Sequence, residues 1–186
     1  MSNRMLNNMS DKPLLRRRLL AFRNALSDDA RARWDAAIGS RIMHWWNAHP
    51  VQTLGVYWPM RNEPDLRFVY DDLARRGVQL ALPIVMGRDA ALRFVAWNPG
   101  EALVQDAMGV SIPAAPGAAM QPEALLIPCV GFNAMRIRLG YGGGFYDRTL
   151  AVSPRPLAIG VGYACGLAAF EAAPHDIALD MIITES

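Results

Sequence analysis

Residues 138–148 read Arg-Leu-Gly-Tyr-Gly-Gly-Gly-Phe-Tyr-Asp-Arg, a glycine-rich stretch that comes shortly after an apolar run and just before a predicted helix start near Phe145. Its glycines crowd together at Gly140, Gly142, Gly143 and Gly144. A glycine run gives up backbone entropy, and proteins accept that loss where the main chain bends sharply or approaches a ligand closely. Successive N–H groups then point into one concavity that holds an anion, and a helix N-terminus adds positive charge to it. The stretch therefore predicts a phosphate-binding loop in a nucleotide-dependent enzyme.

Charged residues at both ends of this loop fit the same interpretation. Arg138 and Arg148 flank the glycines, where they could clamp phosphate oxygens in two-pronged fashion. Asp147 would repel a bare phosphate but suits Mg²⁺, which takes a few carboxylates plus substrate oxygens. The pattern is neither the P-loop nor the GxGxxG dinucleotide fingerprint. A flexible surface turn is the alternative interpretation of a glycine-rich run.

Outward from the loop, the chain alternates between apolar runs of strand length and segments with helical periodicity. Helices are predicted after Pro13, after the cap at Ser27 and over residues 65–76. Strands are predicted over residues 53–58, 78–82, 92–97, 125–128, 157–163 and 177–184. Residues 99–122 are rich in Gly, Pro and Ala and are predicted to be mostly loop. This alternation predicts a three-layer α/β fold with a mixed, mostly parallel sheet and helices on both faces.

Composition restricts the class of protein. The chain has 186 residues and a net charge of only +2, which argues against a dedicated nucleic-acid binder. Cys129 and Cys165 do not make a disulfide framework, and free thiols fit a reducing cytosol. We see neither a signal peptide nor an apolar run of membrane-spanning length. We expect a disordered N-terminus over residues 1–11, a single domain over residues 12–186, and a cytoplasmic monomer that does not bind membranes.

The first helix carries an unusual concentration of arginine. Six arginines crowd residues 16–33, at Arg16, Arg17, Arg18, Arg23, Arg31 and Arg33. A solvated helix face is one interpretation, and an arginine that reaches a phosphate is the other. An RNA-associated module that uses this basic helix is a further hypothesis for the whole chain.

The glycine-rich stretch resembles the signature of the 5-formyltetrahydrofolate cyclo-ligase family, also called methenyltetrahydrofolate synthetase. That signature runs RLG-x-G-x-G-[FY]-YDR and matches residues 138–148. Other segments resemble family elements in the same order, from KPLLR at residues 12–16 and YWPMRNEPD at 57–65 to PHD at 174–176 and ITE at 183–185. The resemblance therefore covers nearly the whole chain after residue 11.

The resemblance also implies roles for individual residues. It implies ATP contacts from Lys12, Arg16, Arg138, Leu139, Gly140, Tyr141, Gly142, Gly143, Gly144, Phe145 and Tyr146. It implies folate contacts from Trp58, Glu63, Tyr141, Gly142, Gly143, Gly144 and Phe145. It implies Mg²⁺ ligation by Asp147 and Asp176. Without the resemblance, Glu63 is a solvated loop acid, Trp58 a core aromatic and Asp176 a turn residue.

The reaction that the family carries out consumes ATP and converts 5-formyltetrahydrofolate into 5,10-methenyltetrahydrofolate, with release of ADP and phosphate. A formamide oxygen is a poor leaving group, and phosphorylation makes it a good one, so that N10 of the folate can close the ring. Such an enzyme works by positioning and charge neutralisation and needs no covalent nucleophile. Glu63 would accept hydrogen bonds from N–H groups of the pterin ring.

Four positions depart from the pattern of the family. Asn133 stands where the family usually has Asp, and Arg136 where it usually has Gly. If position 136 needs a positive φ, a side chain there costs about 1–2 kcal/mol. Residues 109–113 lack the glutamate of a family element, and a glutamine expected near Cys165 is missing. These departures leave open a non-catalytic paralogue that binds nucleotide or folate.

Overall fold

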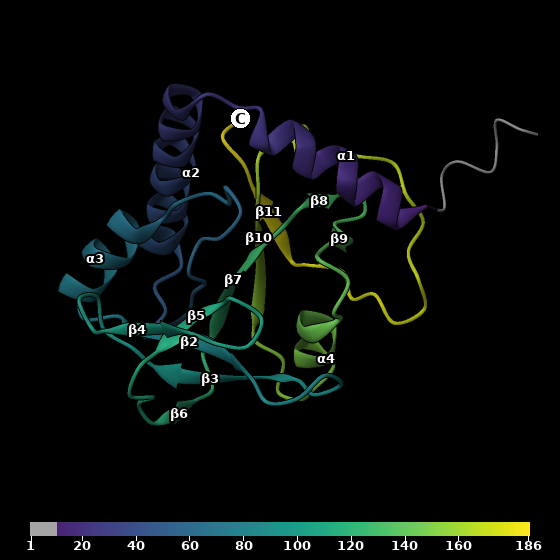
Figure 1. The fold of residues 1–186 in the computed structure, drawn as a ribbon. Helices are drawn as coiled ribbons and strands as arrows, with labels where there is room; N and C mark the ends of the chain where they lie inside the picture. The colour runs from purple at the N-terminus through teal and green to yellow at the C-terminus, as the bar shows by residue number, and fades with distance from the viewer. Residues whose placement is uncertain (1–10) are drawn as a thin grey trace, which may run out of the picture.

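The computed structural model describes residues 11–186 and contains four α-helices and eleven strands within that range (Figure 1). The helices are α1 (Lys12–Asn24), α2 (Asp28–Ala48), α3 (Arg67–Arg75) and α4 (Phe145–Leu150), with a 3₁₀ turn at Ala164–Gly166. The strands are β1 (Thr53–Gly55), β2 (Gln79–Val85), β3 (Leu92–Ala96), β4 (Leu103–Gln105), β5 (Ser111–Pro113), β6 (Ala119–Met120), β7 (Ala124–Pro128), β8 (Gly131–Phe132), β9 (Arg138–Leu139), β10 (Leu157–Val161) and β11 (Met181–Ile183). Residues 1–10, most of the predicted N-terminal tail, lie outside the described residues.

Seven of the strands form one mixed sheet in the order β11-β10-β7-β1-β2-β3-β6. The pairs from β11 to β2 are parallel, and β3 and β6 continue the sheet in antiparallel fashion. All five residues of the central strand β7 are buried, as expected for a parallel strand that is covered on both faces. The prediction of a mixed, mostly parallel sheet is confirmed.

Helices cover both faces of this sheet, so the three predicted layers are also confirmed (Figure 1). On one face, α2 and α3 pack Ile38, Ile42 and Val69 against the sheet. On the other face, the short helix α4 contributes Leu150 to a second apolar cluster. The second layer is thus thin, and α4 carries the glycine loop at its N-terminus. No helix among the described residues is long and apolar enough to cross a membrane.

The first helix lies outside both layers. Asp11 caps α1 by accepting a hydrogen bond from the Leu14 N–H at 3.0 Å, and a proline occupies the first turn. Leu15 and Leu19 pack against a third apolar cluster that includes Leu139 of β9 and Phe170. This packing brings α1 beside the β8–β9 ribbon and the glycine loop (Figure 1).

Residues 99–122 differ from the prediction, because they contain three short strands where mostly loop was expected. Strands β4 and β5 form a two-stranded ribbon, and β6 is the edge strand of the main sheet. Each has only two or three residues, too few to show an alternating pattern among so many Gly, Pro and Ala residues. At the end of the chain the predicted strand 177–184 shortens to β11, because Ile177 and Leu179 donate their N–H groups to Asp147 and Arg136.

Both cysteines are free, as predicted. Cys129 is buried and Cys165 is half-buried. Burial raises the pKa of the Cys129 thiol to about 12, so this thiol stays protonated at neutral pH.

Candidate active site

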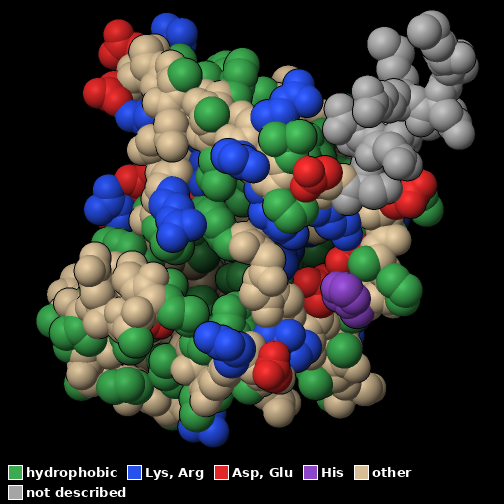
Figure 2. Space-filling model, turned by 45° about the vertical axis from the view of Figure 1, so that its right-hand side comes forward, with side chains coloured by type: hydrophobic (Ala, Val, Ile, Leu, Met, Phe, Trp, Pro, Cys, Tyr) green, Lys and Arg blue, Asp and Glu red, His purple; other side chains and the backbone are tan. Residues whose placement is uncertain are grey.

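A cavity of about 250 Å³ opens where β1, β2 and β7 end. Tyr57 and Trp58 follow β1, Val85 ends β2 and Pro128 ends β7, and the glycine loop closes the opposite wall. Ligands of open α/β sheets bind at this carboxyl edge. Figure 2 shows the hollow on this face, with hydrophobic side chains inside it and Lys and Arg side chains around it.

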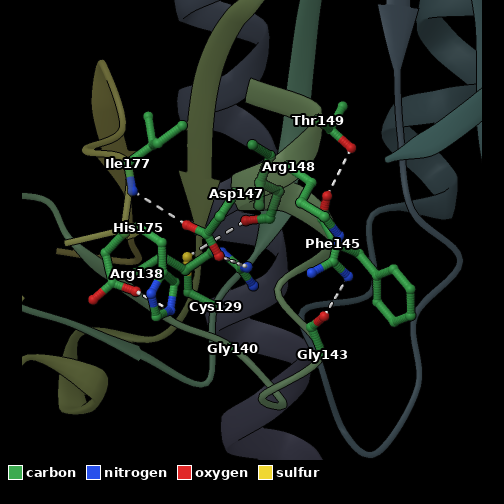
Figure 3. A network of polar contacts seen from close by, with 12 residues as sticks. Cys129, Arg138, Gly140, Gly143, Phe145, Asp147, Arg148, Thr149, His175 and Ile177 are labelled. Atoms are coloured by element: carbon green, nitrogen blue, oxygen red, sulfur yellow. Dashed lines mark hydrogen bonds and ion pairs between the residues drawn. The ribbon is translucent and has the colours of Figure 1, made fainter. Parts of the chain in front are cut away.

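The main chain of the glycine loop adopts conformations that favour glycine. Gly142 has a φ of 98° and Gly144 a φ of 66°, both in the left-handed region. Gly144 is also the N-cap residue of α4, which begins at Phe145. Arg148 stabilises this shape, because its Nη2 donates to the carbonyl of Gly143 at 2.6 Å and its Nε to that of Ala90 at 3.2 Å (Figure 3).

Arg138 and Asp147 point toward each other beside the loop (Figure 3). Their Nη2 and Oδ2 atoms are 3.6 Å apart, and the Arg138 guanidinium lies over the ring of Tyr146, 5.1 Å from its centroid. The other carboxylate oxygen of Asp147 accepts the N–H of Ile177 at 3.2 Å. Arg138 lines the cavity. Asp147 thus holds Arg138 in place on the cavity wall, and the N–H of Ile177 orients Asp147.

Helix α1 places Arg16 against the same loop and Lys12 against the segment that carries Asp176. Arg16 donates from Nε to the carbonyl oxygen of Gly140 at 2.6 Å. Burial lowers the pKa of Arg16, and the neighbouring charge of Arg138 lowers it further. Lys12 forms an ion pair with Asp176, and the Asp176 carboxylate also accepts the N–H of Ala173 at 2.7 Å. Positive charges concentrated in this way attract an anion.

Glu63 lies on the opposite side of the cavity, on the segment that follows β1. It is only 4% exposed, so it is not a solvated loop acid. Its Oε1 accepts the hydroxyl proton of Tyr141 at 2.7 Å and its Oε2 the N–H of Met60 at 3.0 Å. Burial raises the pKa of the Glu63 carboxyl, and these two hydrogen bonds oppose the rise. Trp58 lines the same wall and packs edge-on against Trp97, with ring centroids 5.8 Å apart.

Asp147 and Asp176 come from different elements but lie close together, since Asp147 bonds the N–H of the residue after Asp176. Between residues 11 and 186, no group of three or more His, Cys, Asp and Glu side chains could hold a metal ion. Two carboxylates without a full protein cage fit Mg²⁺, which usually completes its shell with water and substrate phosphate oxygens. Each carboxylate is paired with a cation here, Arg138 for Asp147 and Lys12 for Asp176.

Comparison with known proteins bears directly on this arrangement. A sequence model of the 5-formyltetrahydrofolate cyclo-ligase family matches residues 8–185. The chain belongs to this family. A 5-formyltetrahydrofolate cyclo-ligase of Mycoplasma pneumoniae is 29% identical over 183 residues, covering 94% of this chain and 99% of the relative. One of Escherichia coli K12 is 28% identical over 172 residues, covering 88% and 94%.

Solved structures agree with the sequence comparison. A 5,10-methenyltetrahydrofolate synthetase of Mycoplasma pneumoniae superposes with a TM-score of 0.80 at 27% identity, covering 95% of this chain and 99% of that one. The enzyme of the same name from Aquifex aeolicus superposes with a TM-score of 0.77 at 27% identity, covering 94% and 89%. The cyclo-ligase fold is therefore shared along about 95% of the chain.

Two departures from the cyclo-ligase pattern have a structural explanation. Asn133 is 8% exposed, accepts the N–H groups of Met135 and Ile137 at 3.0 and 2.9 Å, and donates to the carbonyl of Phe170 at 3.1 Å. Arg136 has a φ of 61°, so the position does need the left-handed conformation. The turn between them closes despite the side chain, with Arg136 N–H bonded to Asn133 O at 2.9 Å.

The sequence interpretation missed the role of Arg23. For the crowded arginines of the N-terminal region the sequence offered a solvated face or a contact with phosphate, whereas Arg23 is 4% exposed and donates to the Tyr141 hydroxyl at 2.6 Å. A signal was available, since Lys12, Arg16 and Arg23 follow one another at intervals of four and seven residues, which places them on one side of a helix.

Proposed function

We propose that this chain catalyses the ATP-dependent cyclisation of 5-formyltetrahydrofolate to 5,10-methenyltetrahydrofolate, with release of ADP and phosphate. The observation that carries the proposal is a single cavity with two chemically opposite walls. The buried carboxylate Glu63 lines one wall, and the glycine loop with Arg138 lines the other. The carboxylate can accept hydrogen bonds from the N–H groups of a pterin, and the glycine loop can bind the phosphates of a nucleoside triphosphate.

The proposed chemistry transfers a phosphoryl group and then displaces it. The formyl oxygen on N5 attacks the γ-phosphorus of ATP, the bond to the β-phosphate oxygen breaks, and ADP leaves. The lone pair of N10 then adds to the activated formyl carbon, the C–O bond to phosphate breaks, and the N10 proton passes to solvent. Because charge accumulates on phosphate oxygens, the fixed N–H groups of the loop and Arg138 stabilise the transition state.

Individual residues take the following proposed parts. Lys12, Arg16 and the loop 138–146 bind ATP, while Trp58, Glu63 and residues 141–145 of the same loop bind the reduced folate. Glu63 fixes the pterin by accepting its N–H groups, and Trp58 lines the pocket. Asp147 and Asp176 would hold Mg²⁺, which supplies neutralisation of phosphate charge when it is bound. We further propose that residues 12–186 act as one domain and as a monomer.

A direct assay tests the reaction. Purified protein is mixed with 5-formyltetrahydrofolate, ATP and Mg²⁺, and the methenyl product is followed by its near-ultraviolet absorbance while ADP is quantified. We expect product and ADP in equal amounts, and no product when ATP is omitted. Binding of ATP or folate without any product would overturn the enzyme and favour the non-catalytic paralogue.

The metal assignment has a test of its own in Asp147→Asn. Asparagine keeps an oxygen for the Ile177 N–H but loses the charge, so the local structure is retained while Mg²⁺ loses a ligand. We expect kcat to fall by roughly tenfold or more and the Mg²⁺ concentration for half-maximal rate to rise. Asp71→Asn on the exposed side of α3 is the matched control, and calorimetry of Mg²⁺-dependent ATP binding is a second readout. Full activity at unchanged Mg²⁺ demand would refute the assignment.

A further inference from the structure

Arg23 is a buried guanidinium with few partners. It is 4% exposed on α1, and among the described residues its Nε and Nη1 atoms have no hydrogen-bond partner. The one side-chain hydrogen bond that it makes within residues 11–186 runs from Nη2 to the hydroxyl of Tyr141. Burial of a charge is costly unless other charges compensate it. The compensating charge near Arg23 is the Glu63 carboxylate, to which it is linked through the hydroxyl of Tyr141.

The direction of those hydrogen bonds follows from the chemistry of the groups. Arginine has no acceptor, so the Tyr141 oxygen must accept from Arg23. The single hydroxyl proton of Tyr141 is then free to point to Glu63, whose Oε1 lies 2.7 Å away. Burial raises the pKa of the Tyr141 phenol, so this proton stays on Tyr141 at neutral pH. Arg23, Tyr141 and Glu63 thus form a one-way chain that ends on the carboxylate.

Arg23 and Arg61 are the positive charges that favour the ionised form of Glu63. Arg61 belongs to the same segment as Glu63, and its charge also favours the ionised carboxylate. The other titratable groups near Glu63 are three phenols and a thiol, those of Tyr57, Tyr70 of α3, Tyr146 of α4 and Cys129. Two carboxylates line a second hollow together with Glu63: Asp35 of α2, and Asp65, which is paired with Arg67. Burial raises the pKa values of the four phenols and the thiol in this neighbourhood, so they carry no charge at neutral pH.

We propose that Arg23 is a positioning residue, which acts through the Tyr141 hydroxyl to hold the Glu63 carboxylate ionised and oriented toward the ligand in the cavity. The identity of that ligand as a reduced folate rests on the proposed function. A carboxylate accepts from two neighbouring N–H donors, whereas a protonated carboxyl presents a donor of its own. A pterin edge with two N–H groups is therefore bound by ionised Glu63 and rejected by the neutral form.

The charge of Glu63 is measured directly by titration of its side-chain carboxyl carbon in protein labelled with ¹³C-glutamate, with Glu63→Gln to assign the signal. We expect Arg23→Met to move the Glu63 midpoint to higher pH, because removal of a nearby positive charge favours the neutral acid. Arg23→Lys, which keeps the charge, should restore most of the wild-type midpoint, and Tyr141→Phe should also raise it. Arg18→Met, on the exposed side of the same helix, is the matched control and should leave it unchanged.

If Arg23→Met does not fold, Arg23→Gln replaces it, because glutamine is neutral and still donates an N–H to Tyr141. An unchanged Glu63 midpoint in the folded neutral variant would overturn the proposal. So would an equal shift in the lysine variant, because the side-chain shape rather than the charge would then be what matters. These measurements need no substrate and are decisive even if the protein proves inactive.

Binding of 5-formyltetrahydrofolate without ATP, followed by calorimetry at about pH 6 and about pH 8, links the charge to the ligand. Folate affinity should fall as the pH falls through the pKa of Glu63, because binding needs the ionised carboxylate. The loss should therefore begin at higher pH in Arg23→Met, whose affinity at about pH 6 should fall about tenfold more than at about pH 8. A loss that is equal at both pH values indicates a merely structural role for Arg23. A shifted Glu63 midpoint without any folate binding in wild type would instead refute the proposed function alone.

Discussion

At the scale of single residues, Asn133 shows that a departure from the family pattern can be a solution rather than a defect. Its amide oxygen accepts two main-chain N–H groups, as an aspartate there would. Its NH₂ group also donates to the carbonyl of Phe170, which an ionised aspartate cannot do. The loss of charge is thus accompanied by a hydrogen bond that ties the turn to the segment after the 3₁₀ turn.

A second prediction at this scale concerns Arg136, whose backbone conformation lowers the stability of the fold while its side chain raises it. The left-handed φ disfavours any side chain, but Arg136 Nε donates to the carbonyl of Leu179 at 3.0 Å. Arg136→Ala loses the hydrogen bond and keeps the strain, and Arg136→Gly loses both. We expect the glycine variant to exceed the alanine variant in free energy of unfolding by about 1 kcal/mol, as measured by urea denaturation.

The rate should respond less than the stability. Because the turn already has the conformation that a glycine would adopt, Arg136→Gly should leave kcat close to that of wild type. Equal stability of the glycine and alanine variants would show that the positive φ carries no strain. A large gain in kcat would show that Arg136 impairs the approach to the loop.

At the scale of elements, periodicity and apolar runs were sufficient to predict six of the seven strands of the main sheet, because a buried parallel strand such as β7 is apolar throughout. They failed for β4, β5 and β6, because strands of two or three residues are too short to show an alternating pattern. The bend of the glycine loop could be predicted from its residues, because the flanking arginines, Asp147 and the preceding apolar run distinguish it from a flexible surface turn. The buried relay from Arg23 to Glu63 could not, because it joins three segments that only the fold brings together.

The next prediction concerns Gly140, where the main chain of the loop lies against the side chain of Arg138. A Cβ atom at Gly140 would lie 2.8 Å from Cζ of Arg138, so the guanidinium would have to move. The fold can tolerate this, because the end of a flexible side chain gives way. We expect Gly140→Ala to lower kcat/KM for ATP by about tenfold or more, since a charge-assisted contact is worth roughly 2 kcal/mol.

Gly87→Ala is the matched control, because its Cβ would meet nothing closer than Ala90 at 3.9 Å. Steady-state kinetics and thermal unfolding should be measured on both variants. If Gly140→Ala unfolds at a much lower temperature than Gly87→Ala, the loss reflects the fold of the loop rather than the position of Arg138.

At the scale of the whole molecule, α1 joins parts of the chain that the sheet does not. Lys12 pairs with Asp176 and Arg16 bonds Gly140, so the first helix is tied to both the C-terminal segment and the glycine loop. The sheet itself contains no residue of α1. Helix α1 therefore supports the glycine loop from behind, through these polar contacts and through the apolar packing of Leu15 and Leu19.

The Lys12–Asp176 pair should make this attachment sensitive to acid. Burial alone would raise the pKa of Asp176, but the Lys12 ammonium and the Ala173 N–H outweigh it, and the pKa is lowered. A lowered folded-state pKa stabilises the protein above the ordinary carboxyl pKa of about 4, and the contribution is lost as the pH falls through the folded value. Asp176→Asn should therefore cost about 1 kcal/mol at neutral pH, after allowance for solvent screening.

The measurement is urea denaturation of wild type and Asp176→Asn from neutral to acidic pH. The two curves should approach each other as the pH falls below about 4, the ordinary carboxyl pKa. A difference that stays constant across this range would show that the carboxylate charge contributes nothing. Asp29→Asn, at an exposed position of α2, serves as the control for a general effect of charge removal.

The attachment of α1 has a consequence for how the protein is made. Side chains of α1 bond residues that lie 118 to 164 positions further along the chain. Contacts between such distant positions form late, because the intervening chain must be in place before they can close. Although N-terminal segments generally have the first opportunity to fold during synthesis, this one must wait for its partners. The contacts of α1 with Gly140 and Tyr141 can thus close only after the glycine loop has been made, and its contact with Asp176 later still.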